Sequence, residues 1–216
     1  MKKTEDAVSP VIGVMLMLVI TIIIAAVVSV FAGGVITSVE TPAQTTFSVS
    51  SVIDTISDNN KKNDQPDQKP TGTPYSATNG IRFTVTGGET VFLEDLTIQL
   101  SNTNTQMRFT MRTVANESSY VRGNTSVLKH AGKNTYFSTG GVDYTELNAG
   151  DYFILLADSC YDSTSATDPA ITKGKFLVWS PEDSKGTFTA QIGKDLQYSI
   201  IDTASGNVLQ RGTVKL

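Results

Sequence analysis

The stretch that decides the fold is VIGVMLMLVITIIIAAVVSVFA, residues 11–32 of a chain of 216 residues. Fourteen of its residues are Val, Ile, Leu or Phe, and its polar interruptions are Thr21 and Ser29. As a helix it would be about 33 Å long, which matches the hydrocarbon thickness of a bilayer. Because apolar residues surround every side, such a helix must be covered all round, either by lipid or by other apolar helices.

The charges that flank this stretch predict its orientation. No charged residue occurs from residue 7 to residue 39; Lys2 and Lys3 precede this interval, and Glu40 is the first charge after it. Lys and Arg concentrate on the cytoplasmic side of membrane helices. We therefore expect a cytoplasmic N-terminus and a C-terminal domain outside the cell. A conventional secretory signal has a shorter apolar core of about 7–15 residues, although cleavage after Ala32 by that route stays open.

The residues in front of the apolar stretch resemble those of one protein family. The hexapeptide VSPVIG, residues 8–13, follows a short charged leader and continues into the Ile- and Val-rich run, which is followed by Gly33 and Gly34. This combination closely resembles the N-terminus of archaeal type IV pilins. The resemblance implies a class III signal peptide, cut between Ala7 and Val8 by a membrane prepilin peptidase. The leader, residues 1–7, would stay in the cytoplasm, and the helix would be retained in the mature chain.

The resemblance also implies the partners and the fate of the mature chain. An assembly ATPase with its membrane platform would draw subunits from the membrane into a homo-oligomeric helical filament on the cell surface. Bacterial pilins carry a glutamate at the fifth mature position, whereas Ile12 stands there in this chain, as in the archaeal family. Subunit register must then come from packing, for which the candidates are Val11, Ile12, Gly13, Leu16, Ile20, Ile23, Val27, Val30 and Phe31.

Small residues in the helix offer a second packing signal. They are Gly13, Ala25, Ala26, Ser29 and Ala32. Small side chains let the backbones of two helices approach closely. Ordinary membrane-helix composition explains them equally well, position by position.

After Thr41 and Pro42 the pattern changes from a continuous apolar run to short alternating ones. Ile81, Phe83 and Val85 alternate in one run, and Phe92, Leu96, Ile98 and Leu100 mark the next. The other candidate strands are residues 47–56, 106–114, 152–157, 175–180, 187–192, 198–203 and 208–216, the last two joined by a tight turn at 205–207. Alternation of this kind predicts half-buried strands. We expect eight to ten strands and an α+β chain: a hydrophobic helix over residues 8–40, then an all-β, immunoglobulin-like sandwich over 41–216.

Three features of the β region bear on sites. Residues 57–80 are almost free of apolar side chains and predict a solvated loop; a calcium loop is disfavoured because Lys62 takes the third ligand position after Asp58 and Asn60. Asn116 and Asn124 head N-x-Ser/Thr sequons and are N-glycosylation candidates. A single cysteine, Cys160, excludes an intrachain disulfide and is expected to be buried, as is Trp179.

Enzymatic chemistry finds no support in the sequence. His130 has no nucleophile motif around it, and neither a G-x-S-x-G elbow nor a phosphate-binding loop occurs. One histidine and one cysteine exclude a His/Cys zinc site within the chain. The net charge of −4 is dispersed, which argues against a nucleic-acid partner. We expect no catalytic residue, metal or cofactor.

These observations favour a structural subunit of an archaeal type IV pilus-like filament, used for surface adhesion. One alternative is a single-pass membrane-anchored surface protein with a ligand-binding β domain. Another is a secreted binding or hydrolytic domain that conventional signal cleavage releases.

Overall fold

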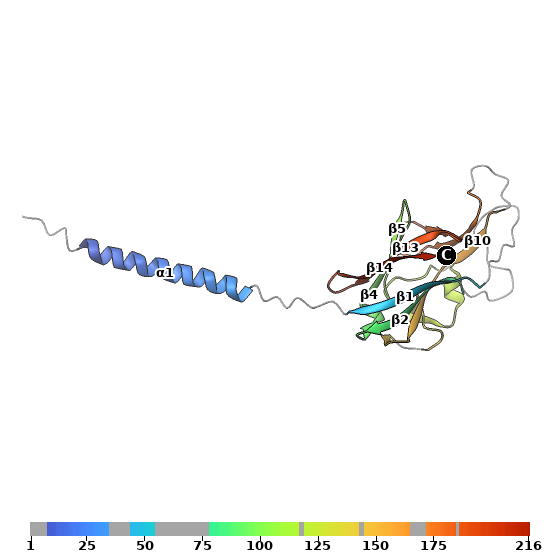
Figure 1. The fold of residues 1–216 in the computed structure, drawn as a ribbon, viewed down its shortest axis with the longest axis horizontal. Coiled ribbons are helices and arrows are strands. Elements are labelled where there is room, and N and C mark those ends of the chain that lie inside the picture. Colours follow the sequence, from blue (N-terminus) through green and yellow to red (C-terminus); the bar gives the residue numbers. More distant parts are fainter. Residues whose placement is uncertain are drawn as a thin grey trace, which may run out of the picture. The chain divides into compact units, whose positions relative to one another are not determined.

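The computed structural model describes residues 8–34, 44–54, 78–116, 119–142, 145–164, 172–184 and 186–216, with the side chains of the helix described from Val11 to Ser29. The chain divides into two compact units, Met1–Thr41 and Pro42–Leu216, and each is treated by itself. The first unit contains the helix α1 (Val8–Gly34), and the second contains all the strands (Figure 1).

The described part of the second unit contains fourteen strands and two short 3-10 helices. In chain order they are β1 (Thr45–Val52), β2 (Gly80–Gly88), β3 (Val91–Phe92), η1 (Leu93–Asp95), β4 (Leu96–Ser101), β5 (Gln106–Phe109), η2 (Tyr120–Gly123), β6 (Val127–His130), β7 (Lys133–Ser138), β8 (Glu146–Leu147), β9 (Tyr152–Leu156), β10 (Ser159–Asp162), β11 (Lys175–Trp179), β12 (Phe188–Gln191), β13 (Asp195–Asp202) and β14 (Val208–Lys215).

Two large antiparallel sheets reproduce the strand order of an immunoglobulin-like sandwich. One sheet has the order β1-β2-β9-β7-β6 and the other β14-β13-β4-β5. Read along the chain, β1, β2, β9 and β7 take the places of strands A, B, E and D, while β4, β13 and β14 take those of C, F and G. The predicted α+β chain, with a helix followed by an immunoglobulin-like sandwich, is therefore confirmed. Two smaller sheets are added, β10-β11-β12 between β9 and β13 in sequence, and β3-β8.

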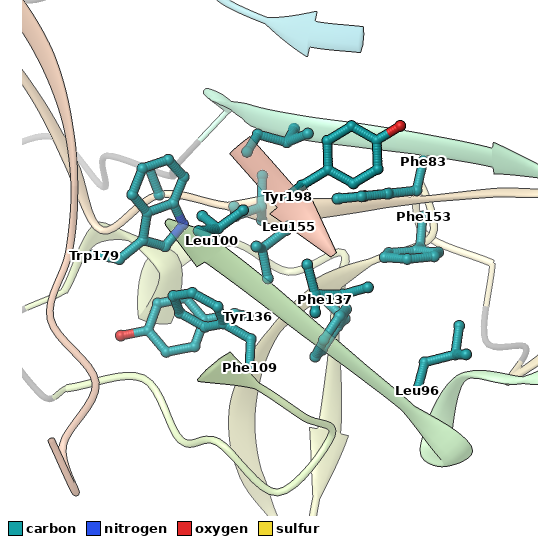
Figure 2. Close-up of a cluster of buried hydrophobic side chains, with 14 of the residues drawn as sticks. Phe83, Leu96, Leu100, Phe109, Tyr136, Phe137, Phe153, Leu155, Trp179 and Tyr198 are labelled. Atoms are coloured by element: carbon teal, nitrogen blue, oxygen red, sulfur yellow. The ribbon is translucent and has the colours of Figure 1, made fainter. Parts of the chain in front are cut away.

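Aromatic rings from the two large sheets meet in one core (Figure 2). Phe83 on β2 stacks on Phe153 of the neighbouring β9, with ring centroids 4.9 Å apart. The same Phe83 meets Tyr198 of β13 edge to face at 5.9 Å, across the interior. Such offset and edge-to-face contacts add to the stabilisation that burial of large rings provides. Because apolar residues alternate along each strand, they lie on one face of each sheet, and these two faces pack together to form the core.

The smaller sheet β10-β11-β12 contributes to the same interior. Trp179, the last residue of β11, is fully buried, which confirms its predicted place in the core. Its indole lies 6.4 Å from the ring of Phe109 and 5.9 Å from that of Phe188. Cys160 on β10 is also buried, as expected.

Side-chain and backbone bridges connect the two large sheets at their edges. The Gln210 side chain on β14 accepts a hydrogen bond from the Phe47 N–H at 2.8 Å and donates one to the Phe47 carbonyl at 2.9 Å. It therefore satisfies both backbone groups of a β1 residue, as a neighbouring strand would. Elsewhere, the segment after β5 forms isolated bridges from Val114 to Thr135 of β7 and from Ala115 to Pro181, which follows β11.

Most of the predicted strands are present, and the differences have local causes. Phe92 does not belong to the buried series of Leu96, Ile98 and Leu100: it is 49% exposed on β3, and the turn η1 separates it from β4. The hairpin β6–β7 was not predicted. Its turn places Ala131 at φ 49° and Gly132 at φ 78°, and this double positive φ is usually signalled by Asn-Gly or Asp-Gly.

Of the remaining predictions about loops, one can be checked and the other concerns residues that the structure mostly does not describe. The turn between β13 and β14 is confirmed, with Gly206 N–H donating to the Asp202 carbonyl at 2.8 Å. The loop predicted for residues 57–80 lies mostly outside the described residues, and so do Asp58, Asn60 and Lys62. Its last residue, Gly80, begins β2 and is buried. The count of eight to ten strands was too low because short edge strands carry little periodic signal.

Candidate functional site

The helix α1 exposes apolar side chains on every side. Fourteen large hydrophobic residues from Val11 to Val28 are 47% to 72% exposed. The first turn contains no acidic residue and the last turn no basic residue. Thr21, a polar side chain within the run, donates its hydroxyl hydrogen to the Leu18 carbonyl at 2.9 Å. Because that hydroxyl is satisfied within the helix, it does not oppose an apolar surrounding.

The length of the helix suits a bilayer as well as a helical bundle. Val11–Ser29, 19 residues, is long and apolar enough to cross a membrane. At 1.5 Å per residue this span is about 28 Å, close to the hydrocarbon thickness of about 30 Å. Within the described residues, the helix therefore satisfies its backbone internally and leaves its side chains to an apolar partner.

The predicted packing residues gather on one side of the helix. Successive helical residues turn by about 100°, so Ile12, Leu16, Ile20, Ile23 and Val27 fall within about 80° of the circumference. Gly13, Val30 and Phe31 fall on or beside this stripe, whereas Val11 falls on the opposite side. All five stripe residues are exposed. We call these five residues the large-residue stripe.

Small residues gather on the opposite side of the helix. Ala25, Ser29 and Ala32 fall within about 60° of one another, roughly half a turn from the large-residue stripe. Gly13 lies elsewhere, and an added Cβ there would meet no atom within 4 Å. A glycine in a helix interior costs about 1 kcal/mol relative to alanine. Packing inside the described chain therefore does not explain Gly13, and its place in a helix–helix contact stays a prediction.

Some predicted site residues cannot be placed. Ala7, on one side of the expected cleavage site, lies outside the described residues. Val8, the residue after the expected cleavage site, is the first residue of α1, so its backbone is helical. The side chains of Val8, Val30 and Phe31 are also outside the description. The cleavage site therefore stays a prediction.

A buried polar cluster in the β domain was not predicted. Asp158, between β9 and β10, is 5% exposed. Its carboxylate accepts hydrogen bonds from the Ser119 hydroxyl, from the Tyr136 hydroxyl at 2.8 Å and from the Ser180 N–H. Burial raises the pKa of the Asp158 carboxyl, and burial together with this neighbouring carboxylate raises the pKa of Tyr136.

The hydrogen bonds of this cluster connect three segments of the β domain, which indicates a structural role. Its three donors come from the segment before η2, from β7 and from the residue after β11, and all of them bond to the Asp158 carboxylate. Among the described residues, no group of three or more His, Cys, Asp or Glu side chains is arranged to hold a metal ion. Sequence reasoning missed Asp158 because its partners are 22 to 39 residues away.

The two sequons differ in what the structure describes. Asn124 directly follows η2 and is partly exposed, with its N–H donating to the Val121 carbonyl at 3.1 Å. Asn116 is described, but Glu117 and Ser118, the rest of its sequon, are outside the description.

The fold and the helix define a class of proteins that join one N-terminal, membrane-length apolar helix to an immunoglobulin-like β-sandwich. Within that class, residues 6–46 match the family model described as "Archaeal Type IV pilin, N-terminal". This match identifies the N-terminal segment as that of an archaeal type IV pilin, a structural protein family and not an enzymatic one. The match covers the whole of α1, and the rest of the β domain lies beyond it. A comparison with curated proteins found none that matches the chain.

Proposed function

We propose that this chain is a structural subunit of an archaeal type IV pilus-like filament, which assembles through packing of α1 and serves surface adhesion. The observation that carries the proposal is the exposure of apolar side chains all around the helix. Burying one large aliphatic side chain is worth about 1.5–3 kcal/mol. Leaving the whole set in water would therefore cost tens of kcal/mol, so the helix requires lipid or other helices.

The two environments are used in sequence. Lipid chains are about as apolar as leucine, so transfer from the bilayer into a helical bundle gains little hydrophobic free energy. Close packing must then favour the bundle, and the small-residue side of α1 and Gly13 provide places for close approach. Extraction from the membrane needs an external motor, which is the role of the assembly ATPase and platform in this proposal.

Processing precedes assembly in this proposal. A prepilin peptidase cuts between Ala7 and Val8, with the N-terminus cytoplasmic and the β domain outside. Removal of residues 1–7 takes away Lys2, Lys3, Glu5 and Asp6, the four charges in front of the apolar run. The mature helix then begins without a charged side chain to bury, which suits the centre of a filament.

The experiment is to shear filaments from cells that produce this chain, image them by electron microscopy and identify the N-terminal peptide by mass spectrometry. The expected result is filaments whose subunits begin at Val8. An intact Met1 confined to the membrane fraction, with no filaments, would instead make the chain a single-pass surface anchor. A soluble chain that begins near Gly33 would make it a secreted domain. Loss of cell attachment in a filament-less strain would test adhesion separately.

A further inference from the structure

We propose that the outer face of the sheet formed by β1, β2 and β9 binds a carboxylate-bearing sugar through Arg82. The inference deepens the adhesive role proposed above and rests on it in one respect, that the β domain lies outside the cell. It names the class of ligand that adhesion would use. Binding of such a ligand does not require a filament, so the two proposals can fail separately.

Arg82 lies on the side of its strand that faces away from the core. Its neighbours in β2, Ile81 and Phe83, are fully buried, whereas Arg82 is partly exposed. Successive residues of a strand point to opposite faces of a sheet. Ser50 of β1 and Ile154 of β9 stand directly opposite Arg82 in the two adjacent strands. The guanidinium group therefore belongs to the outer face of this sheet.

This arginine has no negatively charged partner within the described chain. It is the only charged residue in β1, β2 and β9, three strands that the structure describes in full. Its Nε atom is buried without a hydrogen-bond acceptor, and no described carboxylate forms an ion pair with it. A partly buried charge is costly unless it is paired, and an unpaired buried donor is rare. An anion bound at the two Nη atoms would supply the missing negative charge.

Tyr152 holds the guanidinium group in place. The Cζ atom of Arg82 lies 4.4 Å from the centre of the Tyr152 ring on β9, which is a cation–π contact. The ring itself fits closely, because a Cβ added at Gly140, where φ is +73°, would lie 2.4 Å from the Tyr152 hydroxyl oxygen. A side chain that is already held in one orientation loses less freedom when it binds a ligand. The planar fork of donors is therefore oriented in advance.

Hydroxyl groups surround the arginine on the same face. Ser50 stands opposite Arg82, and Ser48 and Thr84 form the next outward-facing pair along the two strands. Both serines are exposed, and the threonine is partly exposed. A hydroxyl both donates and accepts hydrogen bonds, as the hydroxyls of a sugar do. The guanidinium fork matches a carboxylate with two parallel hydrogen bonds, so this face offers partners for both kinds of group on an acidic sugar.

The same chemistry favours a polysaccharide over an acidic segment of a protein. Protein partners gain most of their affinity from large aromatic or aliphatic side chains that enter a well-packed centre of the interface. Beside Arg82 the exposed residues carry hydroxyls, and the apolar Ile154 is already partly buried. The chain as a whole has a net charge of −4, which repels anions. A polymer of uronic acids would therefore bind through this local site and not through general attraction.

Calorimetric titration of the full chain in detergent with a tetramer of galacturonic acid tests the proposal. The matched neutral ligand is the tetramer of galactose, and tetraglutamate represents an acidic peptide. We expect the acidic sugar to bind about tenfold or more tightly than either of the other two, because it alone offers both carboxylates and sugar hydroxyls. Absence of binding would overturn the proposal, whether or not the chain forms filaments. Equal binding of tetraglutamate would overturn the assignment to a sugar.

Paired variants locate the site. Arg82→Gln should weaken binding of the acidic tetramer about tenfold or more, and Arg82→Lys should not restore it fully, because an ammonium lacks the planar fork. Arg211→Gln on β14 removes the same charge from the other large sheet and should leave binding unchanged. Ser50→Asp puts a carboxylate opposite Arg82 and should block binding, whereas Thr213→Asp on β14 should not. Equal effects within either pair would contradict a site at Arg82, and the Asp pair decides this even if Arg82→Gln fails to fold.

Discussion

At the scale of single residues, two polar side chains, one buried and one half-buried, join parts of the β domain that are far apart in sequence. Asp158 collects three donors, and Gln210 bridges the edges of the two large sheets. Neither stands out in the sequence, because an isolated Asp or Gln usually lies on the surface. Their importance follows from the cost of leaving buried hydrogen-bonding groups unpaired, about 1–3 kcal/mol for each group.

The first prediction concerns the pH dependence that Asp158 imposes. Burial raises the pKa of its carboxyl, so the folded chain retains this proton to a higher pH than the unfolded chain does. Above the ordinary aspartate pKa of 3.8, the stability that Asp158 provides therefore falls as pH rises, until the folded group has ionised. Asp158→Asn removes this titration, so the stability of the variant relative to that of the wild type should increase as the pH rises above 3.8.

Urea unfolding of both proteins at several pH values measures this gain. Asp158→Ala is the contrasting variant: it leaves Ser119, Tyr136 and the Ser180 N–H without their acceptor and should lose about 3 kcal/mol or more at every pH. If the difference in stability between the wild type and Asp158→Asn does not change with pH, burial does not shift the pKa of this carboxyl.

The second prediction concerns Gln210. Its Nε2 donates to the Phe47 carbonyl and also to the Tyr198 hydroxyl at 2.9 Å, while its Oε1 accepts from the Phe47 N–H. Gln210→Ala should lower the free energy of unfolding by about 2–4 kcal/mol, because it leaves both backbone groups of Phe47 unpaired. The control is Gln197→Ala on β13, an exposed glutamine whose loss should change stability by less than about 0.5 kcal/mol. Equal effects in the two variants would argue against the bridge.

At the scale of elements, α1 differs from every strand in what it needs from its surroundings. Each strand is paired and has at least one face turned to the shared core, whereas all described side chains of α1 are exposed. The helix also has two distinguishable sides, the large-residue stripe and the side with Ala25, Ser29 and Ala32. This division allows membrane insertion to be separated from helix packing.

The third prediction uses that separation. Ala25→Leu makes α1 more apolar, so insertion into the membrane should be unchanged or stronger. The added side chain fills the position where a neighbouring helix would approach, so the yield of filaments should drop at least tenfold. Ile24→Leu is the control, because it keeps the volume of a residue in the same turn and should assemble normally. Membrane fractionation and electron microscopy give the two readouts; normal filaments from Ala25→Leu would exclude this side from the packing interface.

At the scale of the whole molecule, the two compact units require different surroundings: the β unit can fold in water, whereas the helix needs an apolar environment. The β unit buries its own apolar residues, including seven aromatic side chains below 2% exposure, whereas every described side chain of the helix, residues 11–29, is exposed. The fourth prediction is that residues 42–216 alone fold into a soluble monomer with the spectrum of a β protein. Residues 8–216 should require detergent or assemble into filaments. Circular dichroism and size-exclusion chromatography test both, and a stable, monomeric, detergent-free form of 8–216 would refute the proposed role of the helix.

The sequence by itself determined the helix, its approximate limits, the family it indicates and most of the strands. It could do so because a continuous apolar run and a period of two are local properties, readable without knowing what lies next to them in space. The same holds for Cys160 and Trp179, whose burial follows from residue type.

Only the tertiary structure decided which strands pair and which polar residues are interior. The order β1-β2-β9-β7 brings together segments from opposite parts of the chain, and the sheet β10-β11-β12 adds Trp179 to the core. Asp158 and Gln210 acquire their roles from partners that are distant in the sequence. Strand pairing and burial depend on the free energy of contacts between residues that are distant in the sequence. A local sequence pattern does not show which distant residues will be in contact.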